Sequence, residues 1–186
     1  MAAKNQNFRK NYYKTLGVPV VQDVDVQASF RALMSDTVID LDQLLRVAMQ
    51  YGVPSMYRSV TWILMLGILP VHKEAWDFVR EQRIATFQDI SSTSQVLEPE
   101  TSPSLHGLYR LYHTVILGLP SDALVENERF LKQLCSVLQS IFTQEWEQFW
   151  CLVSLMEIFS REHVDLSSPM PDNIESIIFR SIGQQS

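Results

Sequence analysis

The sequence has few of the residues that mark secreted, membrane-spanning or nucleic-acid-binding proteins. Its two cysteines, Cys135 and Cys151, lie in apolar helical surroundings without a Cys-x-x-Cys spacing, which favours buried thiols in a reducing cytosol. It has no secretory signal and no run of about 20 apolar residues, so we expect no integral membrane segment. The 15 Lys and Arg residues are outnumbered by 21 Asp and Glu residues. The net charge of −6 argues against nucleic acid as a partner, because phosphate binding needs concentrated basic side chains.

The motifs of common enzyme classes are also absent. There is no Gly-Lys pair of a P-loop, no Gly-x-Gly-x-x-Gly, and no serine or cysteine in a recognisable nucleophile motif. No histidine has an acidic residue three positions before it, which excludes the di-iron Glu-x-x-His pattern. His106 and His113 lie two turns apart on one expected helix, where a metal would need further ligands, so solvated or core-edge histidines are the expectation. We therefore predict no cofactor, no metal site and no enzymatic activity.

What the sequence does contain is helical periodicity over most of its 186 residues, which predicts one all-α domain spanning 1–186. An exposed internal loop, rich in Ser, Thr, Pro and Glu, is expected at 92–104. Asp40 and Ser104 are predicted to cap helices, and Gly52 and Gly118 to end them. The expected helices are 6–16, 25–35, 41–51, 55–66, 72–91, 105–117, 127–141, 142–160 and one from Asp172.

The segment from Gly52 to Pro70 is predicted to hold a central core helix. Ser55 is the expected N-cap and Gly67 the left-handed stop. Every residue from Val60 to Leu66 except Thr61 is apolar, and a helix that is apolar on all sides is expected to be buried on all sides.

Arg58 is the unusual residue of that helix, because a cation in the first turn opposes the helix dipole. Trp62 lies four residues on, where a guanidinium can lie against the indole. A structural Arg58–Trp62 contact is the expectation, and a catalytic arginine is the alternative.

These residues form the pattern Gly-Val-Pro-x-x-x-Arg-x-x-x-Trp-x-x-x-Leu-Gly, which resembles the first signature of the TBC domain. TBC domains are the all-helical fold of activators of Rab-type GTPases. Within that family the chain is most similar to the branch that supplies the small TBC subunit of the tuberous sclerosis complex. The match is specific over about residues 5–70, and it includes Asn7-Phe8-Arg9 and Tyr12-Tyr13. The signature positions are Gly52, Pro54, Arg58, Trp62, Leu66 and Gly67.

The resemblance also implies where catalytic residues should be. Catalytic TBC domains supply an arginine from Ile-x-x-Asp-x-x-Arg and a glutamine from Tyr-x-Gln-Gly. The arginine stabilises charge on the transferring phosphoryl group. This chain has no Gln-Gly dipeptide, and the best-placed counterpart of the arginine motif is Thr86-x-x-Asp89-x-x-Ser92, with serine at the arginine position. Arg80, three residues after Asp77, is the alternative finger, although an ordinary surface charge is expected there.

The resemblance therefore implies a non-catalytic, helix-binding subunit. Its partner would be the coiled coil of hamartin within the hamartin–tuberin complex, which restrains the GTPase Rheb and hence TOR signalling. Localisation would be cytoplasmic, with peripheral association with lysosomal or vesicle membranes through partners. A catalytic activator of a Rab-type GTPase is the rival hypothesis, and a helical adaptor with neither role is the third. Trp76 and Phe87 are the candidate partner-binding residues, although core packing is the favoured interpretation for both.

Family members continue into a second helical half, so the resemblance implies that 1–186 is the N-terminal part of a TBC-like bundle. The predicted last helix carries an apolar stripe of Ile174, Ile177, Ile178 and Ile182. We expect such a stripe to need cover from that second half.

Overall fold

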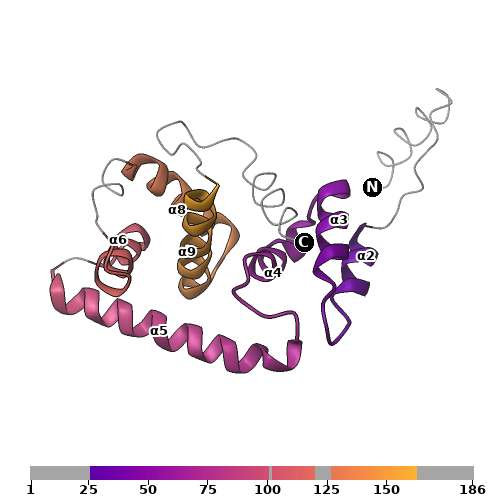
Figure 1. The fold of residues 1–186 in the computed structure, drawn as a ribbon, viewed down its shortest axis with the longest axis horizontal. Helices are drawn as coiled ribbons and strands as arrows, with labels where there is room; N and C mark the ends of the chain where they lie inside the picture. The colour runs from indigo at the N-terminus through magenta and orange to yellow at the C-terminus, as the bar shows by residue number, and fades with distance from the viewer. Residues whose placement is uncertain (1–25, 101, 120–126, 163–186) are drawn as a thin grey trace, which may run out of the picture.

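A computed structural model describes residues 26–100, 102–119 and 127–162, and these residues are mainly helical (Figure 1). Within them the one strand-like pairing is an isolated bridge between Val38 and His72. The all-α prediction is therefore confirmed. The elements are α2 (Val26–Leu33), α3 (Leu41–Tyr51), α4 (Ser55–Met65), the 3-10 turn η1 (Lys73–Ala75), α5 (Trp76–Leu97), α6 (Leu105–Leu111), the π-helix η2 (Tyr112–Ile116), α8 (Glu128–Ile141) and α9 (Glu145–Arg161).

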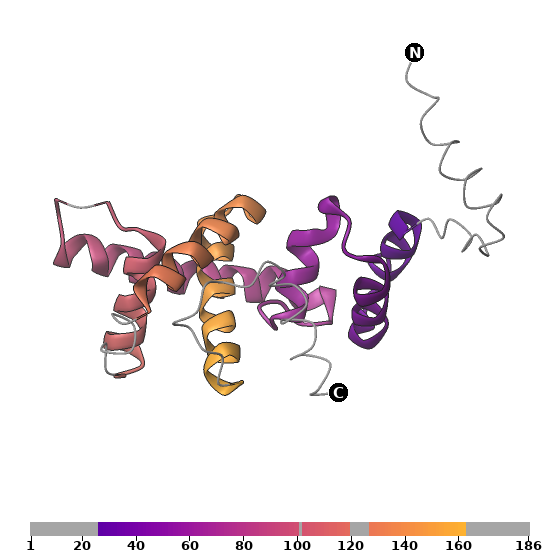
Figure 2. The same cartoon turned by 90° about the horizontal axis from the view of Figure 1, so that it is seen from above.

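The helices form two groups joined by the long helix α5. Helices α2, α3 and α4 lie at one end of α5, and α6, α8 and α9 lie over its other part (Figures 1 and 2). Buried side chains from both groups form one continuous apolar cluster, which runs from Phe30 in α2 to Phe159 in α9. The helices expected at 6–16 and from Asp172, with its isoleucine stripe, lie outside the described residues.

Local signals set several helix ends as predicted. Asp40 caps α3 by accepting a hydrogen bond from the backbone N–H of Gln43 at 2.9 Å. Ser104 caps α6 by accepting one from Gly107 at 3.2 Å. Gly67 follows α4 with φ of +66°, a conformation that side chains with a Cβ rarely adopt. These caps and stops need only neighbouring residues, which is why sequence alone predicts them.

The predicted core helix is buried from Thr61 to Leu66, and α9 is a second helix that is enclosed over a greater length. Helix α9 packs against α4, α5, α6 and α8, and it has eleven buried residues. The first turn of α4 is more open, since Ser55 and Met56 are exposed, and its buried residues begin at Thr61. Pro54, and not Ser55, occupies the N-cap position of α4, without a side-chain hydrogen bond. An apolar composition thus marks a buried helix, but it does not rank two such helices.

The predicted loop at 92–104 is partly helical, because α5 continues to Leu97. Thr93 donates its hydroxyl to the carbonyl of Asp89 at 2.8 Å, so this polar side chain is satisfied inside the helix. The backbone N–H of Glu98 still bonds to the carbonyl of Ser94 at 2.9 Å. Serine and threonine favour turns because their side chains compete for backbone groups, and here the helix accommodates that competition.

Candidate partner-binding groove between α5 and α6

An apolar groove lies between the second half of α5 and the segment formed by α6 and η2. Its volume is about 210 Å³. Four lining residues come from α5 and four from the α6–η2 segment: Thr86, Asp89, Ile90 and Thr93, and Leu111, Tyr112, Val115 and Ile116. We call it the α5–α6 groove.

The two threonines make the α5 wall more apolar than its composition suggests. Thr86 donates its hydroxyl to the carbonyl of Gln82 at 3.0 Å, and Thr93 bonds in the same way to Asp89. Each hydroxyl is therefore paired with its own helix. Asp89 is the one charged residue among those that line the groove.

The opposite wall is shaped by the π-helix η2. The backbone N–H of Leu117 bonds to the carbonyl of Tyr112 at 3.1 Å, a five-residue step instead of four. Because of this wider turn, the residues after Tyr112 no longer share a face with the buried residues of α6. Ile116 is 61% exposed, and Val115 is 58% exposed. A regular α-helical period would instead place Ile116 on the same face as Tyr112, four residues before it.

Tyr112 connects the groove to the core. Its ring makes edge contacts with Phe149 and Trp150 of α9, with centroid distances of 5.6 and 5.9 Å. Burial, followed by the nearby Glu157 carboxylate, raises the pKa of the Tyr112 hydroxyl above its usual value. Trp150 is held in turn by Arg83, whose carbonyl accepts the indole N–H at 3.0 Å and whose guanidinium lies 4.4 Å from the ring centroid. The floor of the groove therefore rests on a packed aromatic cluster.

Neither predicted partner-binding residue lines this groove. Phe87 is 8% exposed and packs on Phe149 with a centroid distance of 5.6 Å, so core packing is the arrangement observed. Trp76 is half-buried and donates its indole N–H to the carbonyl of Pro70 at 2.7 Å. The candidate groove, which sequence reasoning did not identify, has one signal in the sequence, a run of apolar residues from Val115 to Leu119 broken only by Gly118. That run is longer than a single buried stripe requires.

The signature residues lie in the other helix group. Trp62 is fully buried, Leu66 is 8% exposed, and Gly52 and Gly67 both have positive φ angles. The Arg58 guanidinium lies 3.5 Å from the carbonyl of Val53, which is the residue before Pro54. The predicted contact between Arg58 and Trp62 stays a prediction.

The two candidate arginine-finger positions differ in their relation to the groove. Arg80 forms a 2.9 Å ion pair with Asp77 on the exposed face of α5. It precedes Asp89 by nine residues, which corresponds to about 14 Å along a helix. Thr86 and Asp89 of the motif-like segment line the groove, and the exposed Ser92 follows one turn later. The structure therefore brings the serine-substituted segment, and not Arg80, to the groove.

The two cysteines are buried, and neither is in a disulfide. Burial raises the pKa of the Cys135 thiol to about 12, and that of Cys151 well above its ordinary value. A thiolate is the reactive form, so a raised pKa makes both thiols poor nucleophiles. Within the described residues, no helix is both long enough and apolar enough to cross a bilayer.

Comparison with known proteins gives relatives that share one name. The chain is 28% identical to TBC1 domain family member 7 of Danio rerio over 182 residues, which cover 93% of the chain. It is 27% identical to the Xenopus tropicalis protein of that name over 166 residues, or 86% of the chain, and 22% identical to the Homo sapiens protein over 178 residues, or 93%. No protein-family model matches the sequence. The chain spans 60%, 55% and 60% of these three relatives, respectively. The relatives support a TBC-domain family for this chain, as its signature residues predict.

Proposed function

We propose that this chain is a non-catalytic TBC-type subunit that binds the coiled coil of hamartin through the α5–α6 groove. In that role it supports the hamartin–tuberin complex, which restrains Rheb and TOR signalling. The chain would be cytoplasmic and would associate with lysosomal or vesicle membranes through its partners. The proposal joins the family resemblance to one observation, the chemistry of the groove lining. No Arg, Lys or Gln is among the eight lining residues.

The lining of the groove suits binding of a partner helix better than it suits binding of a phosphoryl group. Phosphoryl transfer needs cations that neutralise charge and a group that orients water, and the groove offers one carboxylate instead. An amphipathic helix needs an apolar trough for residues at helical spacing, and Val115, Ile116 and Leu111 supply apolar side chains along one wall. Asp89 adds a rim charge that a basic residue of the partner helix can meet.

Changing Val115 and Ile116 to aspartate should weaken binding to the last third of hamartin by at least about thirtyfold. The reason is that two charges would enter the apolar contact, and loss of a central anchor costs about 2 kcal/mol or more. The measurement is the Kd by titration calorimetry, with a pull-down as a qualitative check.

Phe78→Asp is the matched control for this experiment. Phe78 is 67% exposed on α5 and does not line the groove, so its variant should bind like the wild type. Loss of binding in Phe78→Asp, with retention in the groove variant, would place the hamartin contact elsewhere. Purification of the native complex without hamartin or a GTPase would favour the adaptor hypothesis.

The rival function, activation of a Rab-type GTPase, predicts a different result. We expect no measurable acceleration of GTP hydrolysis in multiple-turnover assays with a panel of Rab proteins. The Arg80→Ala variant should behave like the wild type, because the Arg80 guanidinium pairs with Asp77 on the exposed face of α5. Stimulation of about 100-fold or more that is abolished by Arg80→Ala would contradict the non-catalytic proposal, since a true finger is worth at least that much.

A further inference from the structure

A second and larger cavity lies beside the groove, between the C-terminal end of α5 and the start of α6. Its volume is about 580 Å³ and its lining is mixed polar and apolar. Its polar lining residues include Glu98, Ser102, Ser104, His106 and Arg110. We call it the linker cavity, because residues 98–104 connect α5 to α6.

Ser102 and Ser104 are the two exposed serines that line this cavity. Within the described part of the chain Ser102 makes no hydrogen bond, whereas the neighbouring Ser104 caps α6 and contacts His106 Nδ1 at 2.8 Å. Pro103 follows Ser102 directly and biases it toward an extended backbone. Of these two exposed serines, Ser102 is therefore the one whose hydroxyl is not engaged in a hydrogen bond with a described residue.

Arg110 is the cation available on the same cavity. Its guanidinium makes no hydrogen bond or ion pair with any described residue, while the nearby Lys132 is paired with Glu128 at 2.8 Å. Side chains on a helix lean toward its N-terminus, which for Arg110 is the direction of Ser102. A phosphate accepts the fork of N–H donors that arginine presents.

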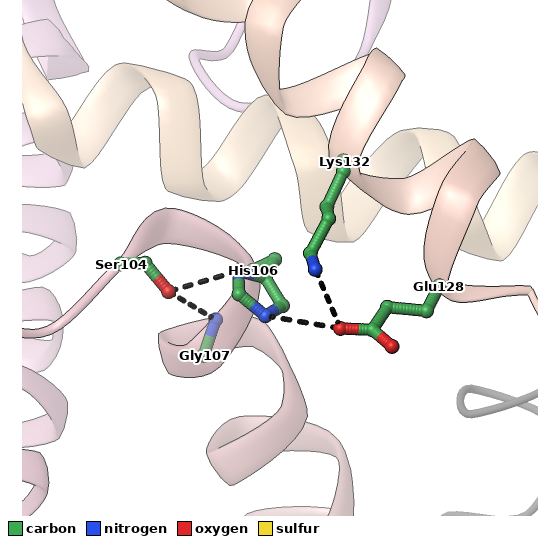
Figure 3. A network of polar contacts seen from close by, with 5 residues as sticks. All are labelled: Ser104, His106, Gly107, Glu128 and Lys132. Atoms are coloured by element: carbon green, nitrogen blue, oxygen red, sulfur yellow. Dashed lines mark hydrogen bonds and ion pairs between the residues drawn. The ribbon is translucent and has the colours of Figure 1, made fainter.

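His106 is already committed to a different set of contacts. Figure 3 shows its ring between Ser104 of the linker and Glu128 of α8, with Nε2 at 3.9 Å from the carboxylate. Burial, with Lys132 and Arg110 nearby, lowers the pKa of His106, so the imidazole is mainly neutral at pH 7. Arg110 is thus the cation of the cavity lining that can meet a negative charge on the linker. The Glu98 carboxylate would repel a phosphate there only weakly, because Glu98 is exposed and solvent screens its charge.

We propose that Ser102 is a phosphorylation site for a proline-directed serine kinase and that Arg110 holds the resulting phosphate. The Ser102 hydroxyl oxygen attacks the γ-phosphorus of ATP, and the bond from that phosphorus to the bridging oxygen of the leaving ADP breaks. The hydroxyl proton passes to the catalytic base of the kinase. The product carries about two negative charges on Ser102, which tie this end of the linker to α6. The proposal does not rest on the hamartin contact, although Leu111 lines both the α5–α6 groove and the linker cavity.

The first test maps phosphorylation of the full chain by a purified proline-directed kinase with MgATP. We expect one phosphoryl group on Ser102, located by peptide mass spectrometry, and its loss in Ser102→Ala and Pro103→Ala. Ser168→Ala is the matched control, because Ser168-Pro169 is the other Ser-Pro pair in the sequence. Phosphate on Ser168 alone, or on neither serine, overturns the proposal.

The second test asks whether Arg110 holds the phosphate. In the ³¹P NMR titration of phosphorylated chain, the second pKa of phosphoserine should lie below its ordinary value of about 6. Arg110→Gln should raise it by about 0.5–1 unit, and Arg110→Lys by less, because lysine keeps the charge but loses the fork. Arg46→Gln, on the distant helix α3, should leave it unchanged. A titration that is the same in wild type and Arg110→Gln overturns the assignment of Arg110.

Discussion

Trp62→Ala is expected to lower the free energy of unfolding by about 3–5 kcal/mol, the range for truncation of a buried Trp. The Trp62 side chain has no exposed surface, and its ring meets Phe142 edge-on with a centroid distance of 6.2 Å. Because Phe142 lies between α8 and α9, the truncation opens a cavity where the two helix groups meet. The measurement is chemical denaturation followed by circular dichroism.

Met56→Ala is the control within the same helix. Met56 is 61% exposed in the first turn of α4, so its loss should change the free energy of unfolding by no more than about 0.5 kcal/mol. Equal denaturation midpoints for wild type and Trp62→Ala would show that Trp62 does not hold the core together.

Phe149→Ala should have a similar cost, about 3–5 kcal/mol, for a different reason. Phe149 is the centre of the aromatic cluster under the α5–α6 groove, with ring centroids of Trp150, Phe87 and Tyr112 at 5.2, 5.6 and 5.6 Å. Its truncation removes three ring contacts at once. Each such aromatic pair stabilises the fold beyond the contribution of the apolar area that it buries. Denaturation midpoints of purified variants measure the effect.

Phe149→Leu and Phe78→Ala complete that experiment. Leucine keeps much of the volume, so Phe149→Leu should cost clearly less than alanine. Phe78 is exposed on α5, and its truncation should change stability by no more than about 0.5 kcal/mol. A Phe149→Ala variant as stable as Phe78→Ala would contradict the role given to the cluster.

Features set by neighbouring residues could be predicted from the sequence. The caps at Asp40 and Ser104 and the stop at Gly67 depend on groups within one helical turn. The helix expected at 142–160 is present as α9, whose buried residues run without a break from Gln148 to Val153, as in a helix that is enclosed on most sides. These elements combine into the all-α fold without any information on long-range contacts.

The candidate groove could not be predicted in the same way, because it depends on how two helices meet. Thr86 and Asp89 are separated from Val115 and Ile116 by more than 25 residues, and only packing brings them together. The π-turn at Tyr112 adds a change of period that no spacing rule anticipates. For Phe87, a helical stripe leaves open whether the partner is the protein core or another chain, and contact with Phe149 decides it.

The central position of α9 has a consequence for the protein during its synthesis. Helices α4, α5 and α6 leave the ribosome before α9, yet each packs against it. The hydrogen bond from the Trp150 indole to the Arg83 carbonyl spans 67 positions, so α5 stays unpartnered on that face while this length is translated. At about 5–20 residues per second that interval lasts several seconds, during which apolar surface is open to chaperones and to other nascent chains. Slow codons between α6 and α9 should therefore increase aggregation of this protein more than slow codons after α9.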